Sequence, residues 1–256
     1  MKRIALIPAR YEASRFPGKL MAPLGGIPVV RRTYAAVTNT GLFDDVMVVT
    51  DSPEIYTEIT HHGGRAYMSQ RPHETGSDRI AEAAATLDAD IVVNVQGDEP
   101  FTSREPLEKL LAVFDAPDAA QTDLASLMQT MHDRHQINDP NFVKVVVDQN
   151  GYALLFSRAP IPYPRATDIR PPYYEHIGVY AFRRQALLDF ANTPATPLER
   201  IEKIECLRYL ETGKKIKMIL TDYMGIEIDT PEDLLNAEKH LANTPATPPQ
   251  IPTIKK

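Results

Sequence analysis

IVVNVQGDEP, residues 91 to 100, joins an apolar run to an abrupt acidic end. Residues 91 to 95 are mostly β-branched, a pattern typical of a central parallel strand that is buried on both faces. Asp98 and Glu99 follow within four residues, so a carboxylate lies at the carboxyl end of this expected strand. Ligands of open α/β sheets bind at such strand ends. The alternative is that the two acids only form the turn before the next helix.

Strand and helix signals alternate through the first half of the chain. This alternation predicts βαβ units and an α/β fold with a doubly wound, mostly parallel sheet. A cap followed by proline and acidic residues marks two helix starts, at residues 51 to 54 and at residues 230 to 233. Strands are expected at 4–9, 46–50, 64–68 and 91–95, and helices at 28–39, 53–62, 77–87 and 103–114.

The second half of the chain has shorter strands with turn signals between them, which predicts a small antiparallel excursion over about residues 122 to 182. Residues 160 to 172 are proline-rich and indicate an exposed loop. We expect a single domain over residues 1 to 242 and a disordered Pro/Thr-rich tail over 243 to 256. The further expected strands are 124–131, 143–148, 152–157, 175–182 and 215–220, and the further helices are 184–191, 198–212 and 231–241.

Composition excludes several classes of protein. A net charge of -6 and a pI near 5.7 argue against a general nucleic-acid binder, which needs a basic face for phosphates. The single cysteine, Cys206, excludes an internal disulfide or a CxxC metal site, and the pattern around it predicts a buried position in a helix. No apolar run approaches the length of a membrane span. These observations lead us to expect a cytoplasmic protein without a membrane partner.

The first expected strand leads into PARYEASRFPGK, residues 8 to 19, which contains Arg10, Arg15 and Lys19. Arginine forks and backbone amides suit phosphate oxygens, so this loop is a candidate triphosphate clamp. It lacks the GxxxxGK[ST] pattern of a Walker loop, and the chain has no GxGxxG dinucleotide fingerprint. The alternative is a solvated basic turn.

Together with other segments, this loop resembles one family of enzymes. The segments that carry the resemblance are IPARYEASRFPGK at 7–19, NVQGDEP at 94–100, YALLFSRAPIP at 152–162, HIGVY at 176–180 and IDTPEDL at 228–234. They resemble the 3-deoxy-manno-octulosonate cytidylyltransferases, and the resemblance covers roughly residues 2 to 241. It implies a nucleotide-diphospho-sugar transferase-like fold, with the excursion forming a sugar-side and dimer subdomain.

The resemblance also implies an activity. CMP would pass from CTP to the anomeric hydroxyl of 3-deoxy-D-manno-octulosonate (Kdo), with release of pyrophosphate, for lipopolysaccharide biosynthesis. The family implies dependence on Mg²⁺ and a homodimer. Charge stabilisation by the metal and by cations makes a side-chain base unnecessary, and no covalent intermediate is expected.

Site residues follow from the matching motifs, position by position. Arg10 and Lys19 match the positions that hold the CTP phosphates, with Ser14 and Arg15 as helpers in the same loop. Asp98 and Asp229 match the two metal carboxylates. The resemblance thus implies a catalytic set of Arg10, Lys19, Asp98 and Asp229.

Two further groups match substrate positions. The nucleotide group adds Gly76, Ser77, Arg79 and Gln96, and the sugar group comprises Gln96, Arg158, His176, Tyr180 and Glu205. Taken singly, each has a structural alternative: His176 and Tyr180 as buried strand residues, Glu205 as a solvated or helix-paired acid, Arg79 as a helix-surface cation. The histidines at 61, 62, 132 and 135 lack metal-like partners, so we interpret them as structural.

Glu227 departs from the family pattern, because many relatives carry glycine there. If residues 226 to 229 are extended, Glu227 and Asp229 point to the same side. The extra carboxylate would then lie near the sugar or Mg²⁺, where it would bind a water of the metal shell or a donor on the substrate, and it leaves open which sugar is used. The alternative is that Glu227 pairs with a nearby lysine or arginine at the rim. Two alternatives remain: a cytidylyltransferase for a related keto-sugar acid, of the 8-amino-Kdo or sialic acid type, and a non-catalytic nucleotide-binding homologue.

Overall fold

The structure is a computed structural model that describes residues 1–12, 16–117, 119–166, 168–169, 171–222 and 225–243. It divides into two units, Met1–Leu107 with Met224–Lys256 and Glu108–Tyr223. The second unit contains the whole expected excursion. The expectation of a single domain stays a prediction. Of the tail that we expected to be disordered, Asn243 is the last residue of a helix and residues 244–256 lie outside the described residues.

Four strands form the sheet of the first unit: β1 (Arg3–Ala9), β4 (Asp45–Thr50), β5 (Ala66–Met68) and β6 (Ile91–Asn94). They pair in the order β5-β4-β1-β6, and all three pairings are parallel. Residues 91 to 93 are fully buried, as their β-branched pattern predicts. The α/β fold with a mostly parallel sheet is therefore confirmed.

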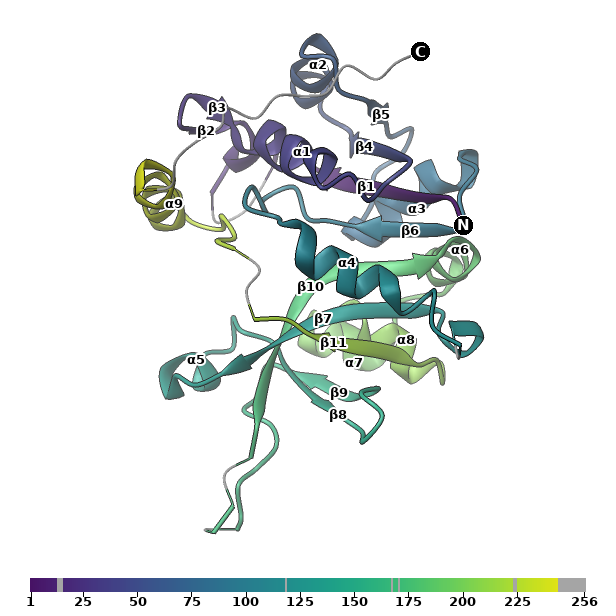
Figure 1. The fold of residues 1–256 in the computed structure, drawn as a ribbon, viewed down its shortest axis with the longest axis vertical. Coiled ribbons are helices and arrows are strands. Elements are labelled where there is room, and N and C mark those ends of the chain that lie inside the picture. Colours follow the sequence, from purple (N-terminus) through teal and green to yellow (C-terminus); the bar gives the residue numbers. More distant parts are fainter. Residues whose placement is uncertain (13–15, 118, 167, 170, 223–224, 244–256) are drawn as a thin grey trace. The chain divides into compact units, whose positions relative to one another are not determined.

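Helices of the first unit cover both faces of this sheet. The chain moves outward from β1 through α1 (Val29–Asn39) and α2 (Pro53–His61), then crosses back through α3 (Gly76–Thr86) to β6. Right-handed crossovers place α1 and α3 on opposite faces (Figure 1). The strand order therefore reverses between β1 and β6, and the crevice at their carboxyl ends is the expected ligand position.

Short elements surround the loop that follows β1. They are η1 (Lys19–Met21) and the two-stranded sheet of β2 (Pro23–Leu24) and β3 (Ile27–Pro28), none of which the sequence pattern predicted. Two longer helices complete the unit. These are α9 (Pro231–Asn243) and the first part of α4 (Arg104–Ala112), which runs into the second unit.

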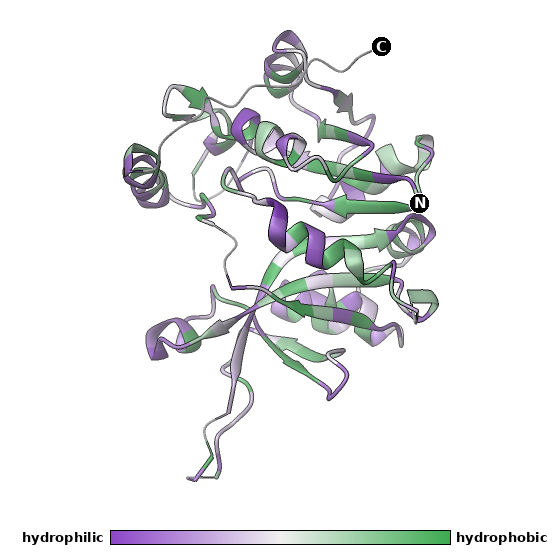
Figure 2. Ribbon diagram, viewed as in Figure 1, coloured by the Kyte–Doolittle hydropathy of each residue, from purple (hydrophilic) through white to green (hydrophobic). Residues whose placement is uncertain are grey.

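The second unit is built on β7 (Leu124–Met131) and β10 (Tyr173–Arg183), which pair antiparallel. β8 (Lys144–Val147) pairs antiparallel with β10 on one side and with β9 (Ala153–Ser157) on the other. β11 (Ile216–Leu220) pairs parallel with β7. Hydrophobic residues concentrate on the strands (Figure 2). The antiparallel excursion is confirmed. The unit also contains η2 (Ala119–Gln121), α5 (Arg134–Asn138) and α6 (Arg184–Asn192).

The expected helix over residues 198 to 212 is wrong as a continuous element. Two helices occur instead, α7 (Pro197–Glu202) and α8 (Leu207–Glu211). Lys203 between them adopts φ 55° and ψ 45°, the left-handed conformation that ends a helix. Cys206 directly precedes α8 and is 2% exposed, so its burial is confirmed although it lies at the helix boundary.

In the part of the chain that the structure describes, no helix combines the length and apolar character needed to cross a membrane.

Candidate functional site

The carboxyl ends of β1 and β6 lie against the first turn of α3. A Cβ atom added to Gly76 would lie 3.2 Å from Pro8 Cγ and 3.7 Å from Gln96 Oε1. Only a residue without a side chain fits this approach without displacing its neighbours. The geometry brings Gly76 and Gln96, two expected nucleotide residues, to the crevice where the strand order reverses.

Lys19 contacts both expected metal carboxylates. Its Nζ atom donates to Asp98 Oδ2 at 2.5 Å and to Asp229 Oδ1 at 2.8 Å. The side chains are 14% exposed for Lys19 and Asp98 and 27% exposed for Asp229. Three of the four residues of the expected catalytic set thus meet in one partly buried cluster.

Local backbone structure aims Lys19 at this point. Gly18, the residue before η1, has φ 71°, and its N–H donates to the Tyr11 carbonyl at 3.1 Å. A positive φ is readily adopted by glycine and costly for most other residues. The PGK sequence therefore forms a tight turn that reverses the loop after β1.

Asp229 reaches the cluster from the other end of the chain through two hydrogen-bonded contacts. The Ile228 N–H donates to the Asp98 carbonyl at 3.0 Å, which holds residues 228 and 229 beside the β6 loop. Thr230 and Asp233 then exchange bonds at the start of α9, since Thr230 N donates to Asp233 Oδ2 at 2.8 Å and Asp233 N donates to Thr230 Oγ1 at 3.2 Å. This reciprocal capping fixes the direction in which the chain leaves Asp229.

Electrostatics of the cluster favour a cation. Burial alone lowers the pKa of Lys19, but the charges and hydrogen bonds of Asp98 and Asp229 outweigh burial and raise this pKa above its ordinary value. Lys19 is therefore a fixed positive charge at neutral pH. Asp98 Oδ1 is buried and has no protein hydrogen-bond partner. An unsatisfied carboxylate oxygen in a buried position is costly, and a metal ion would satisfy it.

Glu227 joins this group. Ligand atoms of Asp98, Glu227 and Asp229 all lie within 4.8 Å of one another. Ile228 between them is fully buried, so Glu227 and Asp229 share a side of the segment, as the alternation of side chains predicts. Hard cations such as Mg²⁺ prefer carboxylate oxygens, and these three residues are suited to hold one. The resemblance had placed only the two aspartates in the metal set.

The remaining nucleotide candidates have mixed surroundings. Arg10 follows β1 and is exposed, whereas Ser77 is buried and accepts from Asn94 Nδ2 at 3.5 Å. Arg79 is 5% exposed and donates to Asp51 Oδ2 at 2.8 Å, which makes it a buried ion-pair residue and not a surface cation. Ser14 and Arg15 lie outside the described residues.

Glu82 on α3 organises the loop that leads to Gly76. Its carboxylate accepts from Gln70 N at 2.7 Å and from His73 Nε2 at 2.5 Å, and these contacts outweigh burial and lower the pKa of Glu82. No sequence pattern predicted this role, because an acid in a helix is ordinarily solvated. Glu82 therefore holds the segment from Gln70 to His73, which precedes Gly76 in the chain.

Three of the expected sugar residues cluster in the second unit. His176 on β10 is buried, its Nε2 lies 3.1 Å from Ser126 Oγ, and its ring centroid lies 5.4 Å from that of Tyr180. Burial lowers the pKa of His176 to about 3, so the imidazole is neutral at pH 7. Burial, with the neighbouring Cys206 and Glu205, raises the pKa of Tyr180 well above its ordinary value. His176 and Tyr180 are thus uncharged, buried residues of β10, as their structural alternative describes, and their role at the sugar stays a prediction.

Arg158 has a different environment. Its guanidinium donates to three backbone carbonyls, those of Glu202 at 2.6 Å, Pro140 at 2.7 Å and Lys203 at 3.3 Å. Arginine carries five N–H donors. The side chain therefore supports the end of α7 and the turn after α5, and the remaining donors could still bind a carboxylate.

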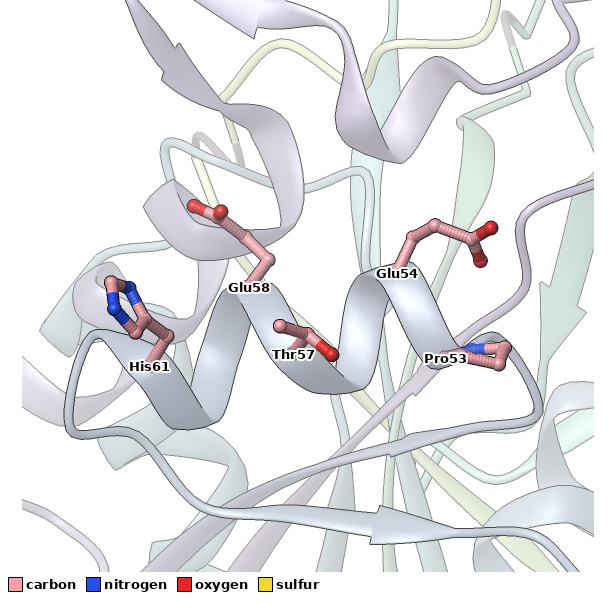
Figure 3. Close-up of a pocket in the computed structure, with 5 residues that line it drawn as sticks. All are labelled: Pro53, Glu54, Thr57, Glu58 and His61. Carbon is pink, nitrogen blue, oxygen red and sulfur yellow. The ribbon is translucent and has the colours of Figure 1, made fainter.

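One hollow on the surface has no link to the expected set. It is formed by a single helix, α2, and Figure 3 shows its five lining residues, Pro53, Glu54, Thr57, Glu58 and His61. Glu58 is ion-paired with Arg31 Nε at 3.2 Å. The interpretation of His61 as structural stays a prediction, and we assign this hollow no function.

Comparisons with known proteins agree with the geometry. A family model described as cytidylyltransferase matches residues 4–216. The chain is 59% identical over 241 residues to a 3-deoxy-manno-octulosonate cytidylyltransferase of Flavobacterium johnsoniae, covering 94% of this chain and 99% of that protein. It is 56% identical to the protein of the same name from Christiangramia forsetii, over 93% of this chain and 96% of the relative.

Solved structures give the same picture. The fold is similar to that of a CMP:2-keto-3-deoxy-manno-octonic acid synthetase complexed with CTP, with a TM-score of 0.89, 34% identity, and coverage of 94% of this chain and 99% of that one. A 4-diphosphocytidyl-2C-methyl-D-erythritol synthase from Anaerococcus prevotii is 18% identical with a TM-score of 0.64, covering 94% of this chain and 99% of that one. This second likeness concerns the fold alone.

Proposed function

The chain belongs to the 3-deoxy-manno-octulosonate cytidylyltransferases, which are nucleotidyltransferases, and we propose that it transfers CMP from CTP to the anomeric hydroxyl of Kdo. The products are CMP-Kdo and pyrophosphate, and CMP-Kdo serves lipopolysaccharide synthesis. The observation that carries this proposal is the meeting of Lys19, Asp98 and Asp229 at the strand ends where an α/β sheet binds its ligand.

The reaction is an in-line displacement at the α-phosphorus. The anomeric oxygen forms a bond to phosphorus, the bond between the α-phosphorus and its bridging oxygen breaks, and pyrophosphate leaves with the bond electrons. The hydroxyl proton passes to solvent. Catalysis of such transfers depends on positioning and electrostatic stabilisation more than on covalent chemistry.

Asp98 and Asp229 would hold Mg²⁺, because their carboxylates converge and Asp98 Oδ1 has no protein partner. When bound, this ion stabilises negative charge on the phosphate and lowers the pKa of the attacking hydroxyl. Lys19 contributes a permanent positive charge beside both carboxylates, and Arg10 adds a second cation after β1. These cations reduce the repulsion between the triphosphate and the carboxylate of the sugar acid.

The sugar residues act by binding. Neutral His176 and Tyr180 and the acid Glu205 are suited to hydroxyl groups, and Arg158 is the cation available for the carboxylate. In this proposal none of them transfers a proton in the chemical step. We therefore expect the enzyme to remain active at pH values at which a catalytic histidine would be protonated.

The test is pyrophosphate release from CTP with Mg²⁺ against a panel of 2-keto sugar acids. We expect the highest kcat/KM with Kdo, and lower values with 8-amino-Kdo and N-acetylneuraminate. A higher value with either of the other acids would assign the protein to that sugar. Absence of release with every acid, in a protein that still binds CTP, would indicate a non-catalytic homologue.

A further inference from the structure

Glu227 stands out because the proposed reaction gives it no role, although it belongs to the carboxylate group of the active site. Its ligand atom lies within 4.8 Å of those of Asp98 and Asp229. Oxygen atoms that share one Mg²⁺ at about 2.1 Å lie up to about 4.2 Å apart. The limit of 4.8 Å is slightly wider than this, so the three carboxylates can share one cation after a small movement of the exposed Glu227 side chain.

Charge points the same way. Asp98, Glu227 and Asp229 carry three negative charges when ionised, and Lys19 returns one positive charge through its contacts with the two aspartates. These four side chains together carry a charge of -2, and this negative charge attracts a divalent cation. Without Glu227, the two aspartates and Lys19 would together carry a charge of only -1.

The hydrogen bonds of Lys19 also leave an oxygen for a cation. Lys19 Nζ engages Asp98 through Oδ2, and the buried Oδ1 of the same carboxylate has no protein partner. Glu227 approaches from the exposed side of the segment, opposite the fully buried Ile228. Asp98 thus offers an oxygen that Lys19 does not use, and Glu227 offers an exposed carboxylate.

We propose that Glu227 is the third carboxylate of the cation site, and that it enables this protein to bind a divalent cation before CTP is present. The inference rests on the proposed function, because it concerns the same Asp98 and Asp229 pair. Carboxylate number is a main determinant of affinity for hard cations. Ordinarily Mg²⁺ arrives with the nucleotide, held by substrate phosphates and one or two carboxylates.

The test is titration of the nucleotide-free protein with Mn²⁺, followed by the electron paramagnetic resonance signal of free Mn²⁺. We expect one site in the wild type and at least about tenfold weaker binding in Glu227→Gln, which keeps the size of the side chain and removes its charge. Glu227→Asp, which retains the charge, should recover part of the affinity. The matched control is Glu232→Gln, an exposed acid in the first turn of α9, which should bind as the wild type does.

Equal affinity of the wild type and Glu227→Gln would overturn the proposal, and so would a wild type that binds no Mn²⁺ without CTP. Thermal unfolding of each metal-free variant separates lost binding from lost folding. Pyrophosphate release by the wild type at saturating Mg²⁺ tests the proposed function separately. If pyrophosphate release is normal while the wild type and Glu227→Gln bind Mn²⁺ equally well, the proposed function holds and only the role of Glu227 is wrong.

Discussion

Lys19 shows how a single side chain sets the electrostatics of the site. Its ammonium group lies between two carboxylates that come from opposite ends of the chain, at 2.5 Å from Asp98 and 2.8 Å from Asp229. The resemblance assigned Lys19 to the CTP phosphates, and that role stays a prediction. The observed contacts add a second role, because they keep the two carboxylates together against their mutual repulsion.

Asp98→Asn and Asp229→Asn should each lower kcat by at least on the order of 10²-fold while the protein remains folded. Either change removes a charge that would hold the metal at the reacting phosphate, a loss comparable to that of one strong transition-state contact. Pyrophosphate release at saturating Mg²⁺ measures the effect, with Glu232→Gln as control. Near-normal release by either variant would remove that residue from the metal role.

His176 should make stability depend on pH. Its pKa falls from 6.5 to about 3 on folding, so between these values the unfolded chain binds one proton more than the folded protein. This contribution is complete above pH 6.5 and is lost as the pH falls, by up to about 1.4 kcal/mol per pH unit.

Urea unfolding at pH 7 and pH 5 tests this dependence. His176→Gln, which cannot titrate, should lose about 2 kcal/mol less than the wild type between these pH values. His135→Gln, at an exposed position of α5, is the control and should behave as the wild type does. If His176→Gln has the same pH dependence as the wild type, burial does not hold His176 neutral.

At the level of secondary structure, Arg158 links elements that are distant in sequence. It follows β9, and its guanidinium bonds the carbonyls of Pro140, Glu202 and Lys203. The left-handed conformation of Lys203 is unfavourable for a residue with a Cβ atom. We attribute the break between α7 and α8 to this long-range contact, which supplies donors to the final carbonyls of α7.

Arg158→Lys should lower the free energy of unfolding by about 1–3 kcal/mol, since one ammonium cannot replace three diverging bonds. It should also weaken binding of the keto acid far more than binding of CTP, because lysine cannot make a two-pronged contact with a carboxylate. Urea unfolding and calorimetry with each ligand measure the two effects, and Arg165→Lys, at an exposed loop position, is the control. Equal weakening for both ligands would contradict a sugar-side role.

For the whole molecule, β9 offers an apolar edge. In the described sheet β9 pairs with β8 alone, and Leu154 and Leu155 are 63% and 38% exposed. An edge strand with exposed leucines favours association with another chain. The homodimer that the family resemblance implies stays a prediction, and this edge is a candidate for its interface.

Leu154→Asp should therefore convert the expected dimer into a monomer, because a charge at the edge opposes burial. Light scattering after gel filtration measures the mass, and Leu235→Asp, which alters a leucine of α9 that is 61% exposed, is the control. A wild type with the mass of one chain, 28.6 kDa, would overturn the dimer itself. A Leu154→Asp protein that remains dimeric would place the interface elsewhere.

Local patterns determined much of the fold. Continuous β-branched runs specified buried parallel strands such as β6, and cap sequences specified helix starts such as the Ser52 side chain that accepts from Ile55 N. These signals succeed because burial and capping depend on residues close in sequence. The break at Lys203 could not be predicted, because we attribute it to a contact with Arg158 from another part of the chain.

The candidate site divides in the same way. The resemblance assigned roles to Lys19, Asp98 and Asp229 from the sequence, and these residue types suit a triphosphate and a metal; the roles stay predictions. The alternation of side chains predicted that Glu227 shares a side with Asp229, whereas tertiary structure alone decided that Lys19 bonds both carboxylates and that Asp98 Oδ1 is buried without a partner. The physical reason is that these properties depend on distances across the fold, here set by the Ile228 N–H bond to the Asp98 carbonyl, 130 positions earlier in the chain.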